Sequence, residues 1–346
     1  MKREILNVKD LEVGFFVRGK WLRALRGISL DLYHGETLAI VGESGSGKSV
    51  LIKSLTGMLE ENGRIKSGRI LFDGEDLAKF TKHSQWKGVR GTKIATVFQD
   101  PMTALNPMQK VGSQIVEALI LHQYLDKKSA KAQALQLMGK VGIQEANQRF
   151  RQYPHELSGG MRQRIVIAIA LACRPRILLC DEPTTALDVR VQAQILSLIA
   201  SLQKEYGFTV IFITHDLGVV ASVADRVAIM YAGQIIEYGT AADIFYRSAH
   251  PYTWALMSSL PQLSFGKENL YAIGGTPPSL FHDIKGDAFA PRNPFALNID
   301  FEEEPPFFRV SDTHYAKTWL LDARAPKIAR PKHLQDLNKI LKEIYL

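Results

Sequence analysis

One stretch of the chain carries the residue types that bind phosphate. Residues 42–49 read Gly-Glu-Ser-Gly-Ser-Gly-Lys-Ser, in which two glycines separated by four residues precede Lys48 and Ser49. Glycines let the backbone wrap around an anion and aim successive N–H groups at it. We expect Lys48 to reach the β- and γ-phosphates of a nucleotide and the Ser49 hydroxyl to occupy one Mg²⁺ position. The expected nucleotide-binding residues here are Gly42, Ser44, Gly45, Ser46, Gly47, Lys48, Ser49 and Val50.

The elements on either side of this loop are those that such a site requires. The apolar run 37–41 predicts a buried strand, and residues 50–59 predict a helix. A helix N-terminus adds partial positive charge at the point where phosphates would lie. The alternative is an ordinary Gly/Ser turn before a helix, and the presence of strand, loop and helix together disfavours it.

A pair of carboxylates closes another predicted core strand. Asp181 and Glu182 directly follow the apolar run 177–180. Paired carboxylates at such a position are costly unless a cation or a proton-transfer task holds them. Asp181 suits the coordination shell of Mg²⁺, and Glu182 suits orienting or deprotonating water. The alternative of two ordinary surface acids fits poorly after four apolar residues.

Two further polar side chains end predicted strands. Gln99 follows the run 94–98, where its amide is expected to contact Mg²⁺ and the attacking water. His215 ends the run 210–214. A lone histidine is usually structural, but one at a strand exit in a phosphate-binding core is a candidate for sensing the γ-phosphate. Gln99, Glu182 and His215 are therefore the expected catalytic residues.

A second glycine-containing helix start lies between these strands. Ser158, Gly159 and Gly160 precede a predicted helix over residues 164–173. Ser158 is a good N-cap, and the glycine pair lets a phosphate approach exposed N–H groups. A simple helix cap without a ligand is an equal alternative on this motif alone. Asp188 follows on a turn before a predicted amphipathic helix that runs through Leu202.

The remaining segments complete the expected domain. Residues 4–32 alternate β-like patches with polar breaks, which predicts a small antiparallel subdomain with loops around Gly14 and at 19–20. Phe15 in this segment is a candidate for stacking on a nucleotide base. A role in the core is an even alternative, and Phe16 and Trp21 are rival candidates. Residues 112–143 predict a helical insertion where a partner could dock, with packing alone as the alternative.

Composition excludes several classes of protein. The 346 residues are 46% hydrophobic and 23% charged, which is typical of a soluble globular protein. The net charge is +8, but the basic residues are scattered rather than clustered, so no nucleic-acid partner is predicted. Cys173 and Cys180 lie in apolar runs, which indicates buried thiols rather than a disulfide.

Nothing in the sequence predicts a membrane-spanning or secreted chain. No apolar run reaches the roughly 18–20 residues needed to cross a bilayer, and the N-terminus lacks the apolar region of a signal peptide. We therefore expect a cytosolic, reducing compartment, with other chains holding the protein at any membrane where it works.

Together, these motifs resemble the ATP-binding subunit of an ATP-binding-cassette (ABC) transporter. The matching features, in the family's order, are the phosphate loop at 42–49, the Gln99 loop, the signature at 157–163, the Walker B strand at 177–182, the Asp188 loop and the His215 switch. The resemblance implies an α/β P-loop NTPase fold over residues 1–250. It has a RecA-like core, an antiparallel β subdomain and a helical subdomain at about 102–165.

The resemblance also implies an activity and an assembly. The chain would be an ATP hydrolase that uses Mg²⁺ and pairs head-to-tail with a second ATP-binding subunit. Each ATP would then lie between the phosphate loop of one chain and the signature of the other. Ser158, Gly159, Gly160 and Asp188 thereby join the expected nucleotide-binding residues, and Ser49, Gln99 and Asp181 are the expected Mg²⁺ ligands.

Finer detail resembles the D-type ATPase of oligopeptide and dipeptide importers. The stretches that carry this resemblance are 42–50, 98–107 and 184–189, and residues 250–256 open the C-terminal extension (251–346) typical of that group. Val50 and Met161 resemble the D-type subunit rather than its F-type sister. The implied role is to energise oligopeptide import as a peripheral protein on the cytoplasmic face of the cell membrane.

The implied partners are an F-type ATPase subunit, two transmembrane permeases and an extracytoplasmic peptide-binding protein. Dipeptides, nickel or another small solute are alternative cargoes. A soluble ABC protein acting on ribosomes or DNA is a further alternative, disfavoured by the single phosphate loop and the short interval between Gln99 and Leu157. A non-hydrolysing regulatory subunit is disfavoured by the intact Glu182 and His215.

The extension departs from its group in one respect. Many relatives place four cysteines there that bind an iron–sulfur cluster, and those positions here hold Asp287, Asn293, Asp300 and Lys317. A cluster needs thiolate ligands, so we predict none. At the end of the chain, the apolar residues predict an amphipathic helix. They are Leu334, Leu337, Ile340, Leu341 and Ile344.

Overall fold

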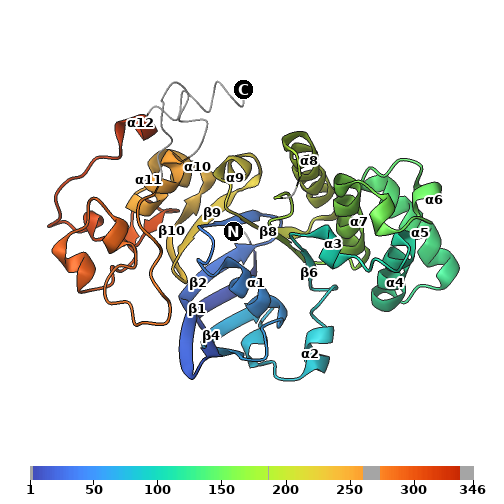
Figure 1. Ribbon diagram of the computed structural model, residues 1–346, viewed down its shortest axis with the longest axis horizontal. Helices are drawn as coiled ribbons and strands as arrows, with labels where there is room; N and C mark the ends of the chain where they lie inside the picture. The colour runs from blue at the N-terminus through green and yellow to red at the C-terminus, as the bar shows by residue number, and fades with distance from the viewer. Residues whose placement is uncertain (1–2, 186, 260–272, 336–346) are drawn as a thin grey trace. The chain divides into compact units, whose positions relative to one another are not determined.

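A computed structural model describes residues 3–185, 187–259 and 273–335, which divide into two compact units (Figure 1). The helical unit consists mainly of Phe80–Ile213. The phosphate-loop unit consists of Glu4–Leu32, Glu36–Lys79 and the described residues from Thr214 onward.

The first sheet of the phosphate-loop unit is antiparallel, with strand order β2-β1-β4-β5. Its elements are β1 (Glu4–Val17), β2 (Lys20–Tyr33), β4 (Gly63–Phe72), β5 (Glu75–Asp76) and the 3-10 helix η1 (Leu77–Lys79). The sheet confirms the expected antiparallel subdomain. The expected loop around Gly14 is wrong, because β1 continues through Gly14, which pairs with Arg64 of β4. The turn at Gly19 is confirmed.

The second sheet of this unit has the order β11-β12-β10-β9-β3. Its strands are β3 (Thr37–Val41), β9 (Arg226–Tyr231), β10 (Gln234–Thr240), β11 (Phe308–Arg309) and β12 (Tyr315–Ala316). β3 pairs with β9 in parallel, and β9 with β10 in antiparallel register. Every residue of β3 is buried, as the apolar run at 38–41 predicts.

The phosphate-loop unit also contains helices. They are α1 (Lys48–Thr56), α9 (Leu217–Val223), α10 (Ala241–Arg247), α11 (Pro251–Ser258) and α12 (Lys332–Gln335), with 3-10 helices η4 (Ala290–Arg292), η5 (Asn298–Phe301) and η6 (Trp319–Leu321). Two of them, α9 and α10, contact β3, β9 or β10 of this sheet. One hydrophobic core joins the strands to the C-terminal region. Val41, Tyr231, Tyr252 and Phe289 all belong to it. The C-terminal region is therefore built into this unit rather than attached to its surface.

The helical unit contains a parallel sheet of order β8-β7-β6. Its strands are β6 (Ile94–Val97), β7 (Ile177–Asp181) and β8 (Thr209–Thr214). Its helices are α2 (His83–Lys87), α3 (Pro101–Ala104), α4 (Val111–Gln123), α5 (Lys127–Lys140), α6 (Ala146–Arg149), α7 (Gly159–Ala172) and α8 (Val189–Tyr206), with the 3-10 helix η2 (Pro154–Glu156). α4, α5 and α7 lie side by side (Figure 1), which confirms the predicted helical insertion.

Two helix boundaries differ from those predicted. The helix expected over residues 50–59 is α1, which begins at Lys48 and ends where Gly57 adopts a left-handed conformation. The helix expected at 164–173 is α7, which begins five residues earlier because Ser158 caps it. Cys173 and Cys180 are free and buried as predicted, and burial raises the pKa of each thiol.

Among the described residues, no helix has the length and apolar character required to cross a bilayer. Leu334 is buried near the start of α12. The other residues of the predicted C-terminal helix, at 337–344, lie outside the described residues, as does Ala186 in the turn before Asp188.

Candidate functional site

The phosphate loop connects β3 to α1 and has little room for side chains. Gly45 and Gly47 have φ values of 81° and 105°, in the left-handed region that favours glycine. A Cβ atom on Gly42 would lie 2.1 Å from the carbonyl oxygen of Met230, at the end of β9. The glycines are therefore required by the backbone path and by the close approach of a neighbouring strand.

The start of α1 is shaped for an anion. The first N–H groups of an α-helix have no intrahelical partners, and no side-chain hydrogen bond caps this helix in the described structure. The Ser46 hydroxyl is buried without a hydrogen-bond partner in the described structure. Lys48 is only 6% exposed, and its ammonium donates to the carbonyl oxygens of Gly42 (2.7 Å) and Glu43 (2.9 Å). These uncapped donors and the lysine fit a phosphate group.

The carboxylate pair lies in the helical unit. Asp181 is the last residue of β7, and Glu182 follows it in a left-handed conformation with φ 46°. Such a conformation is strained for a residue other than glycine. The Glu182 N–H donates to the carbonyl oxygen of Ile213 at 2.9 Å, which holds the backbone in this conformation.

The Glu182 side chain is also held in place. The Gln99 amide donates to its Oε2 at 3.2 Å, and the Thr185 hydroxyl donates to the same oxygen at 2.9 Å. The structure thus brings together two of the residues predicted to be catalytic, from the ends of β6 and β7. Thr185 was not predicted, although it lies only three residues from Glu182.

The glycine pair of the signature lies beside a second helix start in the same unit. The Ser158 hydroxyl accepts from the Met161 N–H at 3.3 Å, and Asp188 Oδ1 accepts from the Val191 N–H at 3.0 Å. A Cβ atom on Gly160 would lie 2.7 Å from Val191, so the beginnings of α7 and α8 meet at this glycine. A cavity of about 500 Å³ opens there, lined partly by Ser158 and Gly160.

The remaining predicted residues belong to the phosphate-loop unit. His215 follows β8 directly and is exposed. Phe15 is half-buried, and its ring leaves no space for a side chain at Gly63. Phe16 and Trp21, the rival aromatics, pack edge-on with ring centroids 5.6 Å apart. None of these contacts selects one aromatic as the base-stacking residue, so that choice stays a prediction.

Two residues that the sequence did not single out hold the phosphate loop through Glu43. The Glu43 N–H donates to the Tyr252 hydroxyl at 2.9 Å. Arg292, from η4 in the C-terminal region, donates to both carboxylate oxygens of Glu43, at 2.9 and 3.1 Å. From the sequence, only the position of Glu43 inside the loop could have indicated this contact. Its partners lie more than 200 residues away in the sequence.

The four positions that the sequence predicts to replace cluster cysteines contain a polar network. Asp287 Oδ1 accepts from the Phe289 N–H, Asn293 Oδ1 from the Phe295 N–H, and Asp300 Oδ2 from the Leu297 N–H. Lys317 pairs with Glu304. Both cysteines of the chain are elsewhere, at 173 and 180, so this donor set lacks the thiolates of an iron–sulfur cluster.

Burial changes the ionisation of one member of this network. Asp287 is 6% exposed, and its Oδ2 has no hydrogen-bond partner in the described structure. Removal from water, together with the nearby Asp300 carboxylate, raises the pKa of Asp287 to about 7.

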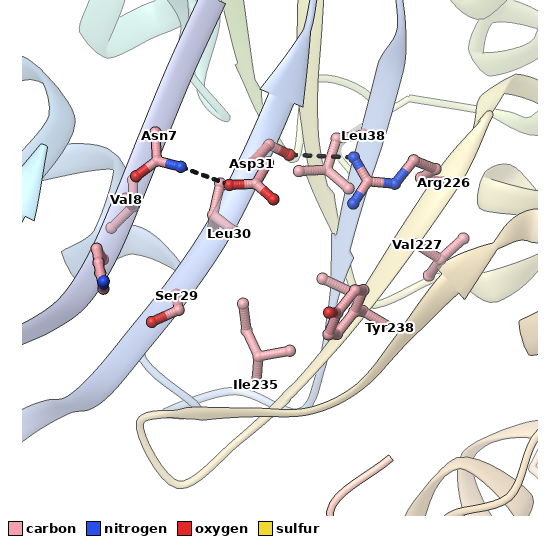
Figure 2. Close-up of a pocket in the computed structure, with 12 residues that line it drawn as sticks. Asn7, Val8, Ser29, Leu30, Asp31, Leu38, Arg226, Val227, Ile235 and Tyr238 are labelled. Carbon is pink, nitrogen blue, oxygen red and sulfur yellow. Dashed lines mark hydrogen bonds between the residues drawn. The ribbon is translucent and has the colours of Figure 1, made fainter. Parts of the chain in front are cut away.

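A separate cavity of about 330 Å³ lies in the phosphate-loop unit (Figure 2). Its described lining residues come from β1, β2, β3, β9 and β10 and not from the phosphate loop. Asn7 donates to Asp31 Oδ1 at 2.6 Å, and Arg226 donates to the Asp31 carbonyl oxygen at 3.1 Å, so these polar groups already have partners. None of the predicted site residues is among the described residues that line this cavity.

Comparison with known proteins gives a consistent result. Residues 25–185 match the family model described as ABC transporter, and residues 236–299 match the model described as the C-terminal region of oligopeptide/dipeptide transporters. The oligopeptide transport ATP-binding protein AmiE of Streptococcus pneumoniae is 60% identical over 99% of this chain and 96% of its own length. The dipeptide transport ATP-binding protein DppD of Lactococcus lactis is 54% identical over 94% of each chain.

A solved structure supports the same fold. The dimeric ATP-binding cassette MJ0796, in a post-hydrolysis state bound to ADP and Pi, matches with a TM-score of 0.61 and 27% identity. The match covers 68% of this chain and 99% of that one.

The composition of the four cysteine-equivalent positions predicts a colourless protein. Full-length protein purified from iron-supplemented cells should contain no stoichiometric iron and lack the broad visible absorbance of an iron–sulfur centre, because the site offers no thiolate. Iron analysis and an absorbance spectrum check this. One or more equivalents of bound iron with sulfide would contradict the assignment.

The raised pKa of Asp287 predicts a pH-dependent stability. A carboxyl with a folded-state pKa of about 7, above its ordinary value of 3.8, stabilises the fold fully below about pH 4. That contribution is lost as the pH rises towards and through 7 and amounts to a few kcal/mol in order of magnitude. Asp287→Asn should therefore remove part of the decline in unfolding free energy between pH 5 and 8.

Urea unfolding of the full chain across this pH range measures the effect. Asp322→Asn is the matched control, because hydrogen bonds with Arg324 lower the pKa of Asp322 to about 2, outside the tested window. Parallel pH profiles for the wild type and Asp287→Asn would contradict the role given to Asp287.

Proposed function

The chain belongs to the ABC transporter family, as an ATP-hydrolysing subunit, and we propose that it energises the import of oligopeptides. The observation that carries the ATP-binding role is the uncapped start of α1, with Lys48 folded over the loop beside it. The cargo rests on the relatives, whose names specify oligopeptide and dipeptide transport. Import of dipeptides is the alternative that the second relative supports.

We assign the phosphate contacts to the loop itself. The main-chain N–H groups at the start of α1 and the Lys48 ammonium are placed to bind the β- and γ-phosphates of ATP. Gly42, Ser44, Gly45, Ser46, Gly47 and Val50 complete this cradle in our assignment. Phe15 is the proposed partner of the adenine ring.

We propose that one metal ion binds beside the phosphates of ATP. Mg²⁺, when bound, supplies charge neutralisation on the phosphate oxygens. Ser49, Gln99 and Asp181 are the residues that we propose to hold it. Hydroxyl, amide and carboxylate oxygens are the ligands that this ion prefers.

Water activation is assigned to Glu182. Its carboxylate is held by Gln99 and Thr185, and its backbone is held in a strained left-handed conformation. A base fixed in this way loses little freedom when it accepts a proton from the attacking water. We propose that His215 contacts the γ-phosphate and thereby senses whether ATP is bound.

The signature is proposed to act on a neighbouring chain. In a head-to-tail pair, Ser158, Gly159 and Gly160 would present the start of α7 to the ATP of the partner, with Asp188 beside them. Donors from two chains then meet at one polyphosphate, so closure of the pair and competence for hydrolysis are coupled.

The proposed domain division is an ATP-binding domain over 1–250 and an extension over 251–346.

The proposed assembly follows from this role. The chain would pair with a second, F-type ATP-binding subunit and with two transmembrane permeases, and an extracytoplasmic protein would deliver the peptide. It would lie as a peripheral protein at the cytoplasmic face of the membrane. The C-terminal end of α4 has two exposed side chains, Leu121 and Tyr124, to which a permease could dock.

The assignment of the base predicts the behaviour of Glu182→Gln. The variant should retain ATP binding, because the amide keeps the size and hydrogen bonding of the side chain. It should lose ATP turnover by about a hundredfold or more, because the general base is removed. Phosphate release by the assembled transporter, alongside nucleotide binding, measures the two effects.

Glu205→Gln is the matched control. It removes a carboxylate from the same unit, where Glu205 pairs with Lys140 on the surface, and should leave turnover unchanged. Turnover of Glu182→Gln close to that of the wild type would refute Glu182 as the base while leaving ATP binding intact.

A further inference from the structure

The phosphate loop is held from the C-terminal region by an ion pair. Two guanidinium nitrogens of Arg292 donate to the two carboxylate oxygens of Glu43, at 2.9 and 3.1 Å. The Arg292 side chain is 5% exposed and the Glu43 side chain is 24% exposed. A forked pair that is largely removed from water is stronger and more directional than an exposed one.

Arg292 is itself fixed by several groups. Its Nη1 also donates to the Tyr231 hydroxyl at 3.2 Å, and its Nε donates to the Gly274 carbonyl oxygen at 2.8 Å. Its guanidinium carbon lies 5.8 Å from the centre of the Tyr231 ring and 5.9 Å from that of Phe289. Burial alone lowers the pKa of Arg292, but the bonds to Glu43 and Tyr231 outweigh it and raise that pKa above its ordinary value.

Glu43 is in turn fixed at each of its polar groups. Its carboxylate takes the Arg292 fork, its N–H donates to Tyr252, and its carbonyl oxygen accepts from the Lys48 ammonium at 2.9 Å. The same residue therefore contacts the lysine that we propose for phosphate binding. Movement of Glu43 would move the support of Lys48.

The ion pair also neutralises the negative charge of Glu43. Glu43 places a carboxylate within the loop that we propose to surround a polyphosphate. An uncompensated carboxylate there would repel the nucleotide, and the repulsion would be strong in a partly buried site. Arg292 neutralises it at hydrogen-bond distance.

We propose that Arg292 of the C-terminal region is a positioning residue for ATP: it orients the phosphate loop through Glu43 and cancels the charge of that carboxylate. This inference rests on the proposed ATP-binding function. It gives the C-terminal region a direct part in nucleotide affinity, in a chain whose cysteine-equivalent positions hold Asp287, Asn293, Asp300 and Lys317.

The test is nucleotide binding by the full-length chain, titrated with fluorescent analogues of ATP and ADP in the presence of Mg²⁺. Arg292→Ala should raise the Kd for ATP by about tenfold or more, since a paired, partly buried charge is lost. The rise should be smaller for ADP, which carries less negative charge. A purely structural role would weaken both nucleotides equally.

Two further variants separate charge from shape. Glu43→Gln removes the carboxylate and should bind ATP at least as tightly as the wild type. Combined with Arg292→Ala, it should recover much of the lost affinity, so that the two changes are not additive. Arg292→Lys keeps the charge but not the fork and should fall between the wild type and Arg292→Ala.

Arg324→Ala is the matched control. Arg324 forms a similar forked pair with Asp322, at 2.8 and 3.0 Å, in the same region but with 82% of its side chain exposed. It should bind both nucleotides as the wild type does.

The outcomes are distinguishable. Equal Kd values for the wild type and Arg292→Ala would overturn the inference while leaving the proposed function intact, as would equal losses for ATP and ADP without rescue by Glu43→Gln. Should Arg292→Ala fail to fold, markedly weaker ATP binding by Glu43→Gln would overturn the inference. Absence of ATP binding in both the wild type and Arg324→Ala would overturn the proposed function and this inference with it.

Discussion

The phosphate loop depends on a backbone contact that leaves no room for a side chain. The carbonyl oxygen of Met230 occupies the space that a Cβ atom on Gly42 would need. Beyond it, the Gly233 N–H donates to the Ser46 carbonyl oxygen at 2.9 Å, and the Arg26 N–H donates to the Gly233 carbonyl oxygen at 2.8 Å. The loop is thus formed only when β2, β9 and the turn after β9 are in place, so that anion binding requires the fold of the whole unit.

The C-terminal region takes part in the same arrangement. Glu304 accepts hydrogen bonds from Arg26 at 3.2 Å and from Gln234 at 2.8 Å, and it pairs with Lys317. Lys317 is one of the four residues that the sequence predicts to replace cluster cysteines. A hydrogen-bonded ion network thereby links the extension to β2 and β10. The Arg26 side chain is 7% exposed and that of Lys317 is 14% exposed, so both largely buried cations depend on the Glu304 carboxylate for neutralisation.

Much of this arrangement could be predicted from local sequence. Four consecutive apolar residues, 38–41, predicted the completely buried β3, and the helical insertion shows the periodicity of α4 and α5. Motif spacing predicted that Gln99 and Glu182 end strands of one core, and the structure joins them by a hydrogen bond. Boundaries were less predictable. Gly14 suggests a loop, yet β1 continues through it because pairing with β4 outweighs the weak strand preference of glycine.

Contacts between distant residues were beyond prediction. Glu43 and Arg292 are 249 residues apart, and nothing in either local sequence indicates the other. The positive φ of Glu182 was likewise hidden, because it follows from a hydrogen bond to the neighbouring strand rather than from residue type. Strain and long-range pairing are properties of the folded unit, and here both occur at residues assigned to the ATP site.

The most direct test of this account is a cryo-EM map of the full-length chain, in its transporter, with ATP and Mg²⁺. The γ-phosphate should lie against the N–H groups at the start of α1, within hydrogen-bond distance of the Lys48 ammonium. Nucleotide density away from Lys48, with the start of α1 contacting only water or protein, would contradict it.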